Sequence, residues 1–253
     1  MQWQAVSHFF LKRGTILFIY AALGFITAIQ LTMVGTHAFK MPSKHQYKQD
    51  IMSDTAVLKQ FEGQRYSAYN NYTVFKRSYF HLSEGKNLYT IYPKEQWDIY
   101  KYSPSFAVLM GPLALLPDLA GLILWNLLNA FVLLTAIRML PIKQERQSLI
   151  LLFVIVELLI NLQNAQSNAL LAGLMIAAFG CLEKRKGVWA ALWLVLASYI
   201  KIYGAVGFCL FLFYPDKLKF IFYLVLWTIL LFVLPLLVSP YHTLLWQYGN
   251  WHN

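Results

Sequence analysis

The chain has 253 residues, of which 58% are hydrophobic and only 13% are charged, about half the ~25% that is usual in soluble domains. So few charges could not cover the surface of a water-soluble fold, and the 17% aromatic content excludes a disordered chain. The formal net charge is +10, but the basic residues are dispersed among apolar runs, which argues against a nucleic-acid partner. The composition therefore predicts an all-α protein built from several transmembrane helices.

The first apolar run covers residues 16–36, carries no charge and would extend about 31 Å as a helix at ~1.5 Å per residue, enough to cross a bilayer. Lys12 and Arg13 precede it, so the helix is expected to enter from the cytoplasm. A cleaved signal peptide is the alternative, but the run is long for one and no A-x-A-like site follows it. We therefore predict a membrane anchor over residues 1–36 and a large extracytoplasmic loop over residues 37–102.

Residues 103–240 are expected to form a multi-span helical bundle, and residues 241–253 a truncated outer loop. The apolar runs of the bundle cover residues 103–116, 119–137, 148–162, 169–182, 188–200, 202–214 and 220–238. Several of these would extend only about 20 Å at ~1.5 Å per residue, less than the roughly 30 Å hydrocarbon core. Short or broken membrane helices are tolerated where neighbours bury them or where they line a wet cavity. The pattern favours a transporter, a channel or a membrane enzyme over a simple anchor.

Three short basic clusters separate these runs, and short basic loops prefer the cytoplasm. They are Arg138/Lys143/Arg146, Lys184/Arg185/Lys186 and Lys217/Lys219. All three can share that side if residues 103–140 cross the membrane once and residues 188–214 form two half-helices that meet at Lys201. The outer loop, the turn over residues 161–168, Lys201 and the C-terminal tail then share the outer face. A plain seven-crossing count is the alternative, and it places residues 184–186 outside.

Two polar features interrupt the apolar runs. Side chains with amide or hydroxyl groups crowd the turn over residues 161–168, which is either a solvated turn or a site for sugar or phosphate, because amides both donate and accept hydrogen bonds. They are Asn161, Gln163, Asn164, Gln166, Ser167 and Asn168. Lys201 stands in an otherwise uncharged stretch, where a lysine is costly unless it snorkels or pairs with an anion such as phosphate. Glu157 is a second intramembrane charge, to which the pattern assigns no chemistry beyond pairing with a neighbouring helix.

The outer loop interleaves aromatic and basic side chains around Asn71, Arg77 and His81, and it ends at Lys101 and Tyr102. This composition suits sugar stacking and phosphate contacts, and it equally suits an interfacial helix with snorkelling side chains. No HExxH, Walker A, GxSxG or nucleotide-binding glycine pattern occurs in the sequence. We therefore predict no metal and no nucleotide cofactor.

Four segments, taken in chain order, resemble glycosyltransferase family 87, a group of membrane enzymes of the GT-C class. They are residues 71–89 (NYTVFKRSYFHLSEGKNLY), 101–117 (KYSPSFAVLMGPLALLP), 165–171 (AQSNALL) and 197–204 (ASYIKIYG). The family has an Asp-aromatic-x-Val-Tyr stretch ending in Gly-x-x-Leu-Tyr, then Tyr-Pro-Pro, then Gly-Gln-x-Asn, then Leu-Lys-x-Tyr-Pro. The resemblance covers roughly residues 70–240. Ala165 stands at a glycine of these motifs and Gly204 at a proline, and both are mild departures.

The resemblance implies transfer of a hexose, typically mannose, from a polyprenyl-phosphate sugar to a glycan or glycolipid acceptor. The reaction would take place on the extracytoplasmic side of the plasma membrane, with membrane lipid and the lipid-linked donor as partners and no separate cofactor. The candidate residues for contacts to the donor phosphate or sugar are Lys101, Tyr102, Gln166, Asn168, Lys201, Tyr203 and Arg77.

The catalytic carboxylate is the main departure from the family pattern. The family's presumed catalytic Asp corresponds to Asn71, and an amide cannot act as a general base. Another carboxylate would then be required, and the outer loop offers Asp50, Asp54 and Asp98, of which we take Asp98 as the candidate.

Two other functions stay open. The broken helices would also suit a small-solute transporter, although the sequence has no convincing paired repeat. The amide at Asn71 favours a non-catalytic membrane assembly subunit. The chain also ends soon after residue 240, where family members continue with further spans, so we expect a truncated protein.

Overall fold

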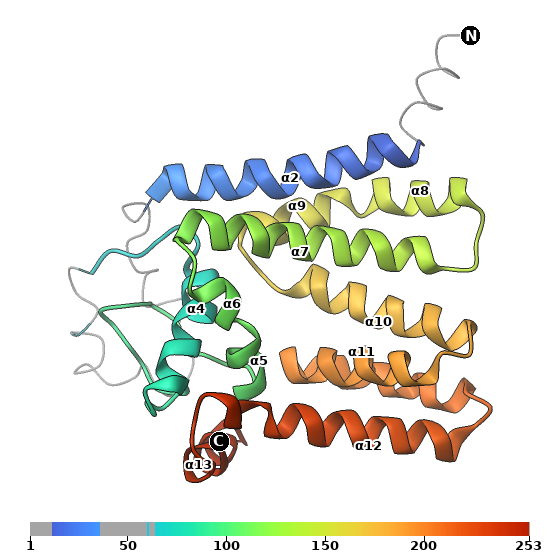
Figure 1. The fold of residues 1–253 in the computed structure, drawn as a ribbon. Helices are drawn as coiled ribbons and strands as arrows, with labels where there is room; N and C mark the ends of the chain where they lie inside the picture. Colours follow the sequence, from blue (N-terminus) through green and yellow to red (C-terminus); the bar gives the residue numbers. More distant parts are fainter. Residues whose placement is uncertain (1–11, 36–59, 61–63, 253) are drawn as a thin grey trace.

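The computed structural model describes residues 12–35, 60 and 64–252, and these residues form helices and connecting turns without a β-strand (Figure 1). The helices are α2 (Arg13–Val34), α4 (Asn70–Ser83), α5 (Pro104–Leu109), α6 (Gly111–Ala114), α7 (Asp118–Met139), α8 (Gln144–Phe153), α9 (Ile155–Gln163), α10 (Asn168–Glu183), α11 (Gly187–Ile200), the 3-10 helix η2 (Ile202–Phe213), α12 (Lys217–Val233), the 3-10 helix η3 (Leu234–Leu237) and α13 (Tyr241–His252). The prediction of an all-α polytopic bundle is confirmed.

Three helical segments are long and apolar enough to cross a membrane: α2, α7 and the segment Lys217–Leu237, which joins α12 to η3. The shorter apolar helices α10, α11 and η2 lie among them (Figure 1). Helix α7 packs against α2 and α10, α10 packs against α11, and α11 packs against η2 and α12. Because α7 has neighbours on two sides, its polar residues Asn126 and Asn129 are fully buried and available for contacts between helices.

A break at Lys201 separates α11 from η2. Lys201 has an extended backbone (φ −140°, ψ 136°) between the last residue of α11 and the first of η2. Helix η2 packs so closely on α11 that a Cβ atom on Gly204 would lie 2.4 Å from the carbonyl carbon of Ala197. The predicted pair of half-helices meeting at Lys201 is therefore confirmed. Position 204 therefore requires glycine, because a side chain there would clash with the backbone of Ala197.

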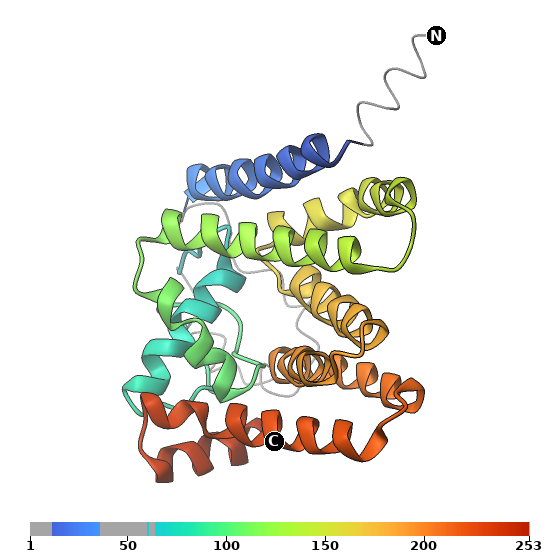
Figure 2. The same ribbon diagram turned by 45° about the vertical axis from the view of Figure 1, so that its right-hand side comes forward.

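The basic clusters gather at one end of the bundle. Helix α2 begins at Arg13, α7 carries Arg138 in its last turn, α11 follows Lys186 and α12 begins at Lys217. These helix ends lie together at the end where Figures 1 and 2 mark the start of the blue helix. The structure thus has the arrangement in which the three clusters share one side of the bundle.

The opposite end is capped by α4, α5, α6 and α13 (Figure 1). The sequence predicts loops over residues 37–102 and 241–253, but helices α4 and α13 occupy part of these segments. Phe75 of α4 is fully buried against the rings of Tyr102, Phe106 and Trp125. Gln247 of α13 is also fully buried, and its side chain donates to the Lys86 carbonyl (2.6 Å) and accepts from the Leu88 amide (3.1 Å). These buried contacts explain why the two segments are helical.

Candidate functional site

A cavity of about 640 Å³ is lined by α7, α8, α9 and α10 and by Lys201. Its apolar wall residues are Leu133, Ile137, Ile150, Val154, Leu158, Ile160, Ala169, Ala172 and Ile176. Its polar residues are Glu157, Asn161, Asn164, Gln166, Asn168 and Lys201, and most of them lie at the turn between α9 and α10. The cavity therefore combines a polar end with long apolar walls, as a ligand with a charged head and a hydrocarbon chain requires.

Lys201 forms the cationic part of the polar end. Its Nζ atom donates to Oδ1 of Asn168 at 2.6 Å and lies 5.7 Å from the centre of the Tyr102 ring. Burial raises the pKa of Tyr102 to about 12, so its hydroxyl stays protonated and can donate a hydrogen bond. The Ser103 amide donates to the Tyr199 carbonyl (3.4 Å), which holds this stretch beside the end of α11. Four predicted residues, Tyr102, Gln166, Asn168 and Lys201, thus lie in or beside one cavity.

Two buried asparagines fix the start of α10. The first amides of a helix have no partner within that helix, and the Ser167 side chain does not cap α10. Instead, Asn161 Oδ1 accepts from the Ala169 amide (3.1 Å) and Asn129 Oδ1 accepts from the Leu170 amide (3.0 Å). Helices α7 and α9 therefore position the first turn of α10, which carries Asn168 toward Lys201.

The turn between α9 and α10 contains a residue with a left-handed backbone. Ala165 has φ +48° and is fully buried, and its carbonyl accepts from the Trp125 indole at 3.0 Å. This conformation costs a non-glycine residue roughly 1–2 kcal/mol, so a glycine would adopt it more easily at this position. The backbone geometry needed for the turn is therefore kept here by tertiary contacts.

We expect Ala165→Gly to leave the free energy of unfolding unchanged or to raise it by up to about 1 kcal/mol, because relief of strain offsets the flexibility of glycine. The matched control Ala172→Gly, in the regular part of α10, should lower it by about 0.5–1 kcal/mol. Thermal unfolding in detergent, followed by tryptophan fluorescence, measures both. A larger loss for Ala165→Gly than for the control would contradict this account.

Asn71 contacts the same turn from α4. Its side-chain amide donates to the Asn164 carbonyl at 2.8 Å. An ionised aspartate could not make this bond, since a carboxylate only accepts. Asn71 therefore tethers α4 to the turn between α9 and α10, through a residue that lines the cavity.

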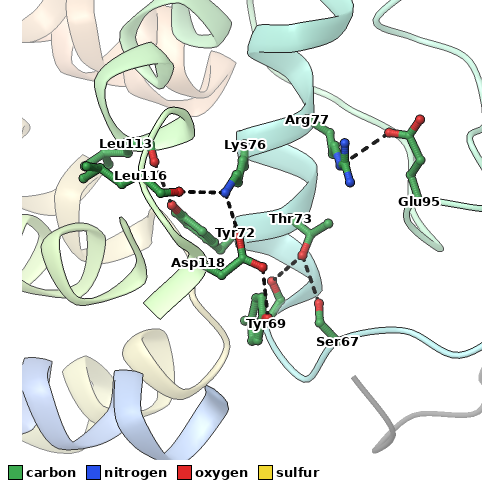
Figure 3. A network of polar contacts seen from close by, with 10 residues as sticks. All are labelled: Ser67, Tyr69, Tyr72, Thr73, Lys76, Arg77, Glu95, Leu113, Leu116 and Asp118. Carbon is green, nitrogen blue, oxygen red and sulfur yellow. Dashed lines mark hydrogen bonds and ion pairs between the residues drawn. The ribbon is translucent and has the colours of Figure 1, made fainter. Parts of the chain in front are cut away.

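Arg77 lies elsewhere, in a second polar network between α4 and the start of α7 (Figure 3). Its Nε atom is 3.5 Å from the Glu95 carboxylate. The neighbouring Lys76 forms an ion pair with Asp118 (2.7 Å) and donates to the Leu116 carbonyl (2.8 Å). Arg77, Lys76 and Asp118 line a separate cavity of about 460 Å³. This network joins α4 to α7 and does not share the cavity of Lys201.

Three further predicted residues do not line the Lys201 cavity. Asp98, which is partly buried, and Lys101, which is exposed, form an ion pair with each other (3.0 Å). The Tyr203 side chain, on η2, is 72% exposed. Asp50 and Asp54 lie outside the described residues. Within the described ranges no group of three or more His, Cys, Asp or Glu side chains could hold a metal ion.

The sequence alone does not identify Asn129 as a residue that holds the start of α10, and it assigns Glu157 no functional role. Asn126 and Asn129 lie three positions apart in an apolar run, which is a signal that one helix face meets polar groups of its neighbours. Glu157, Asn161 and Asn164 recur at helical spacing and line the cavity together. That spacing was the available signal for Glu157.

Comparison with known proteins identifies the family. The model of glycosyltransferase family 87 matches residues 100–251, which include α5 to α12, nearly all of α13, the cavity and Lys201. No curated protein and no solved structure matches the chain significantly. The family match covers more than half of the chain and agrees with the apolar helices that can cross a membrane. The chain therefore belongs to glycosyltransferase family 87 and is a membrane glycosyltransferase.

Proposed function

We propose that the protein transfers a hexose, with mannose as the first candidate, from a polyprenyl-phosphate sugar to a hydroxyl of a glycan or glycolipid. The observation that carries this proposal is the cavity in which Lys201 and Asn168 stand at one end of apolar walls. An ammonium is a strong point charge for phosphate. The apolar side chains of α7, α8 and α10 offer a surface for the polyprenyl chain. Membrane lipid and the lipid-linked donor are the partners we expect.

The sugar-transfer reaction assigns a role to the Lys201 ammonium. The acceptor oxygen bonds to C1 of the sugar while the bond from C1 to the phosphate oxygen breaks. The hydroxyl proton passes to a general base, and polyprenyl phosphate leaves. Lys201 would stabilise the negative charge that grows on the leaving phosphate, and the neutral Tyr102 hydroxyl could donate to the same group. No separate cofactor is needed for this step.

The charge distribution supports an orientation. Short basic segments near membrane helices prefer the cytoplasm, and the basic clusters lie at the end of the bundle opposite α4 and α13. We therefore propose that the Lys201 end faces the extracytoplasmic side of the plasma membrane, where the acceptor would bind.

The proposed donor class is tested by a transfer assay on membranes that contain the chain. Radiolabelled polyprenyl-phosphate mannose, polyprenyl-phosphate glucose and a nucleotide sugar serve as alternative donors. We expect label to pass to a lipid or glycan acceptor from a lipid-linked donor and not from the nucleotide sugar. Transfer from the nucleotide sugar alone would overturn the proposal. Uptake of free sugar into sealed vesicles without transfer would instead support the transporter.

A further inference from the structure

Glu157 is an unpaired carboxylate in the Lys201 cavity. It lies in α9, within an apolar segment, and its side chain is exposed and lines the cavity. Among the described residues it has no ion pair and no side-chain hydrogen bond, although the cavity also contains Lys201. Ionisable side chains at membrane depth are costly and mark substrate pathways. An unpaired carboxylate that lines this cavity is therefore a candidate for binding a ligand.

The position of Glu157 relative to the polar end limits what that ligand can be. Glu157, Asn161 and Asn164 follow one face of α9 at intervals of about one helical turn. Glu157 and Asn164 are separated by about 10 Å along the helix axis, at ~1.5 Å per residue. A hydrogen bond of about 3 Å at each end leaves room for one sugar ring between them.

The hydrogen-bonding groups on this face of α9 also fit a sugar. Asn161 is committed to backbone groups and to Asn129, and the Asn164 side-chain nitrogen is committed to the Ile160 carbonyl. Glu157 has no such partner among the residues that the structure describes, and an ionised carboxylate accepts several hydrogen bonds and offers no donor. Neighbouring hydroxyls of a hexose are complementary to such a group. A second phosphate is not, because two anions would repel each other.

We infer that Glu157 binds hydroxyls of the donor sugar and so contributes to the selection of that sugar. This inference rests on the proposed function, in which Lys201 holds the phosphate of the same donor. Glu157 is then a binding residue at the far end of the sugar, two helical turns away from the polar turn that Asn71 contacts. Its distance from that turn separates it from the acceptor side.

Donor binding, measured without turnover, tests the inference. The affinities of the purified full chain for polyprenyl-phosphate mannose, polyprenyl-phosphate glucose and sugar-free polyprenyl phosphate are compared in detergent. We expect the wild type to bind at least one sugar-bearing lipid about tenfold more tightly than the sugar-free lipid, as one charge-assisted hydrogen bond would provide. Glu157→Gln should abolish this difference and leave binding of the sugar-free lipid unchanged. Glu145→Gln, at the basic end, is the matched control and should behave as the wild type.

The outcomes separate the two proposals. If the wild type binds none of the three lipids, the proposed function fails and the inference fails with it. If the wild type binds them but Glu157→Gln keeps the full preference for a sugar-bearing lipid, the inference alone fails. Loss of binding to all three lipids in Glu157→Gln would also overturn it, because the carboxylate would then act on more than the sugar. Glu157→Gln should fold, since the described residues give the carboxylate no partner to lose.

Discussion

Lys201→Ala is expected to lower sugar transfer by about 100-fold or more while the protein still folds and inserts. Removing one partner of a desolvated charge pair costs about 2–5 kcal/mol, and about 2.7 kcal/mol corresponds to 100-fold in rate. The folded state loses little, because within the described part of the chain the Lys201 ammonium makes one hydrogen bond, to Asn168, and one ring contact, to Tyr102. The measurement is transfer from polyprenyl-phosphate sugar at a donor concentration below saturation.

Two further variants test whether the loss of transfer is caused by the missing charge at position 201. Lys201→Arg keeps the charge and should retain more activity than the alanine variant, although its planar head has a different shape. Lys184→Ala removes an exposed lysine at the opposite end of the bundle and should leave transfer within twofold of the wild type. Wild-type turnover by Lys201→Ala would remove the proposed phosphate contact. Circular dichroism and size-exclusion chromatography check that each variant is folded.

The break at Lys201 could be predicted from the sequence because its cause is local. A single charge in a long apolar stretch cannot sit at the centre of a membrane-spanning helix at low cost. The basic clusters also restrict the topology, since a chain that reverses at Lys201 brings them to one side. These two features required only the order of charged and apolar residues, and the helix breaks follow them.

The partners of the polar side chains could not be predicted in the same way. Asn161 and Asn168 have the same side chain and lie in the same turn region, yet Asn161 is buried as a cap for α10 while Asn168 is exposed in the cavity. The difference depends on the rotation of α9 and on Asn129 of α7, which is distant in sequence. Arg77 is a similar case, because Glu95 and the position of α4 decide which cavity it lines.

The substitution expected to affect stability most is Asn161→Leu. Asn161 is 6% exposed, accepts from the Ala169 amide (3.1 Å) and donates to the Gln166 carbonyl (3.2 Å). Leucine would leave both backbone groups without these partners, at about 1–3 kcal/mol for each buried group. We expect a loss of about 2–5 kcal/mol and, because the first turn of α10 is released, a weaker contact between Asn168 and Lys201.

Thermal unfolding in detergent measures this loss, and Asn164→Leu provides the matched control. Asn164 is exposed, and among residues 12–35, 60 and 64–252 its side chain donates only to the Ile160 carbonyl of its own helix (2.8 Å). Its backbone carbonyl, which accepts from Asn71, is unchanged by the substitution. The control should therefore change stability by about 0.5 kcal/mol or less, as exposed sites usually do. Equal unfolding temperatures for the two variants would show that Asn161 does not hold the start of α10. If Asn161 does hold the start of α10, the Asn161→Leu variant should lose transfer activity as well as stability, since α9 would no longer fix the position of Asn168 opposite Lys201.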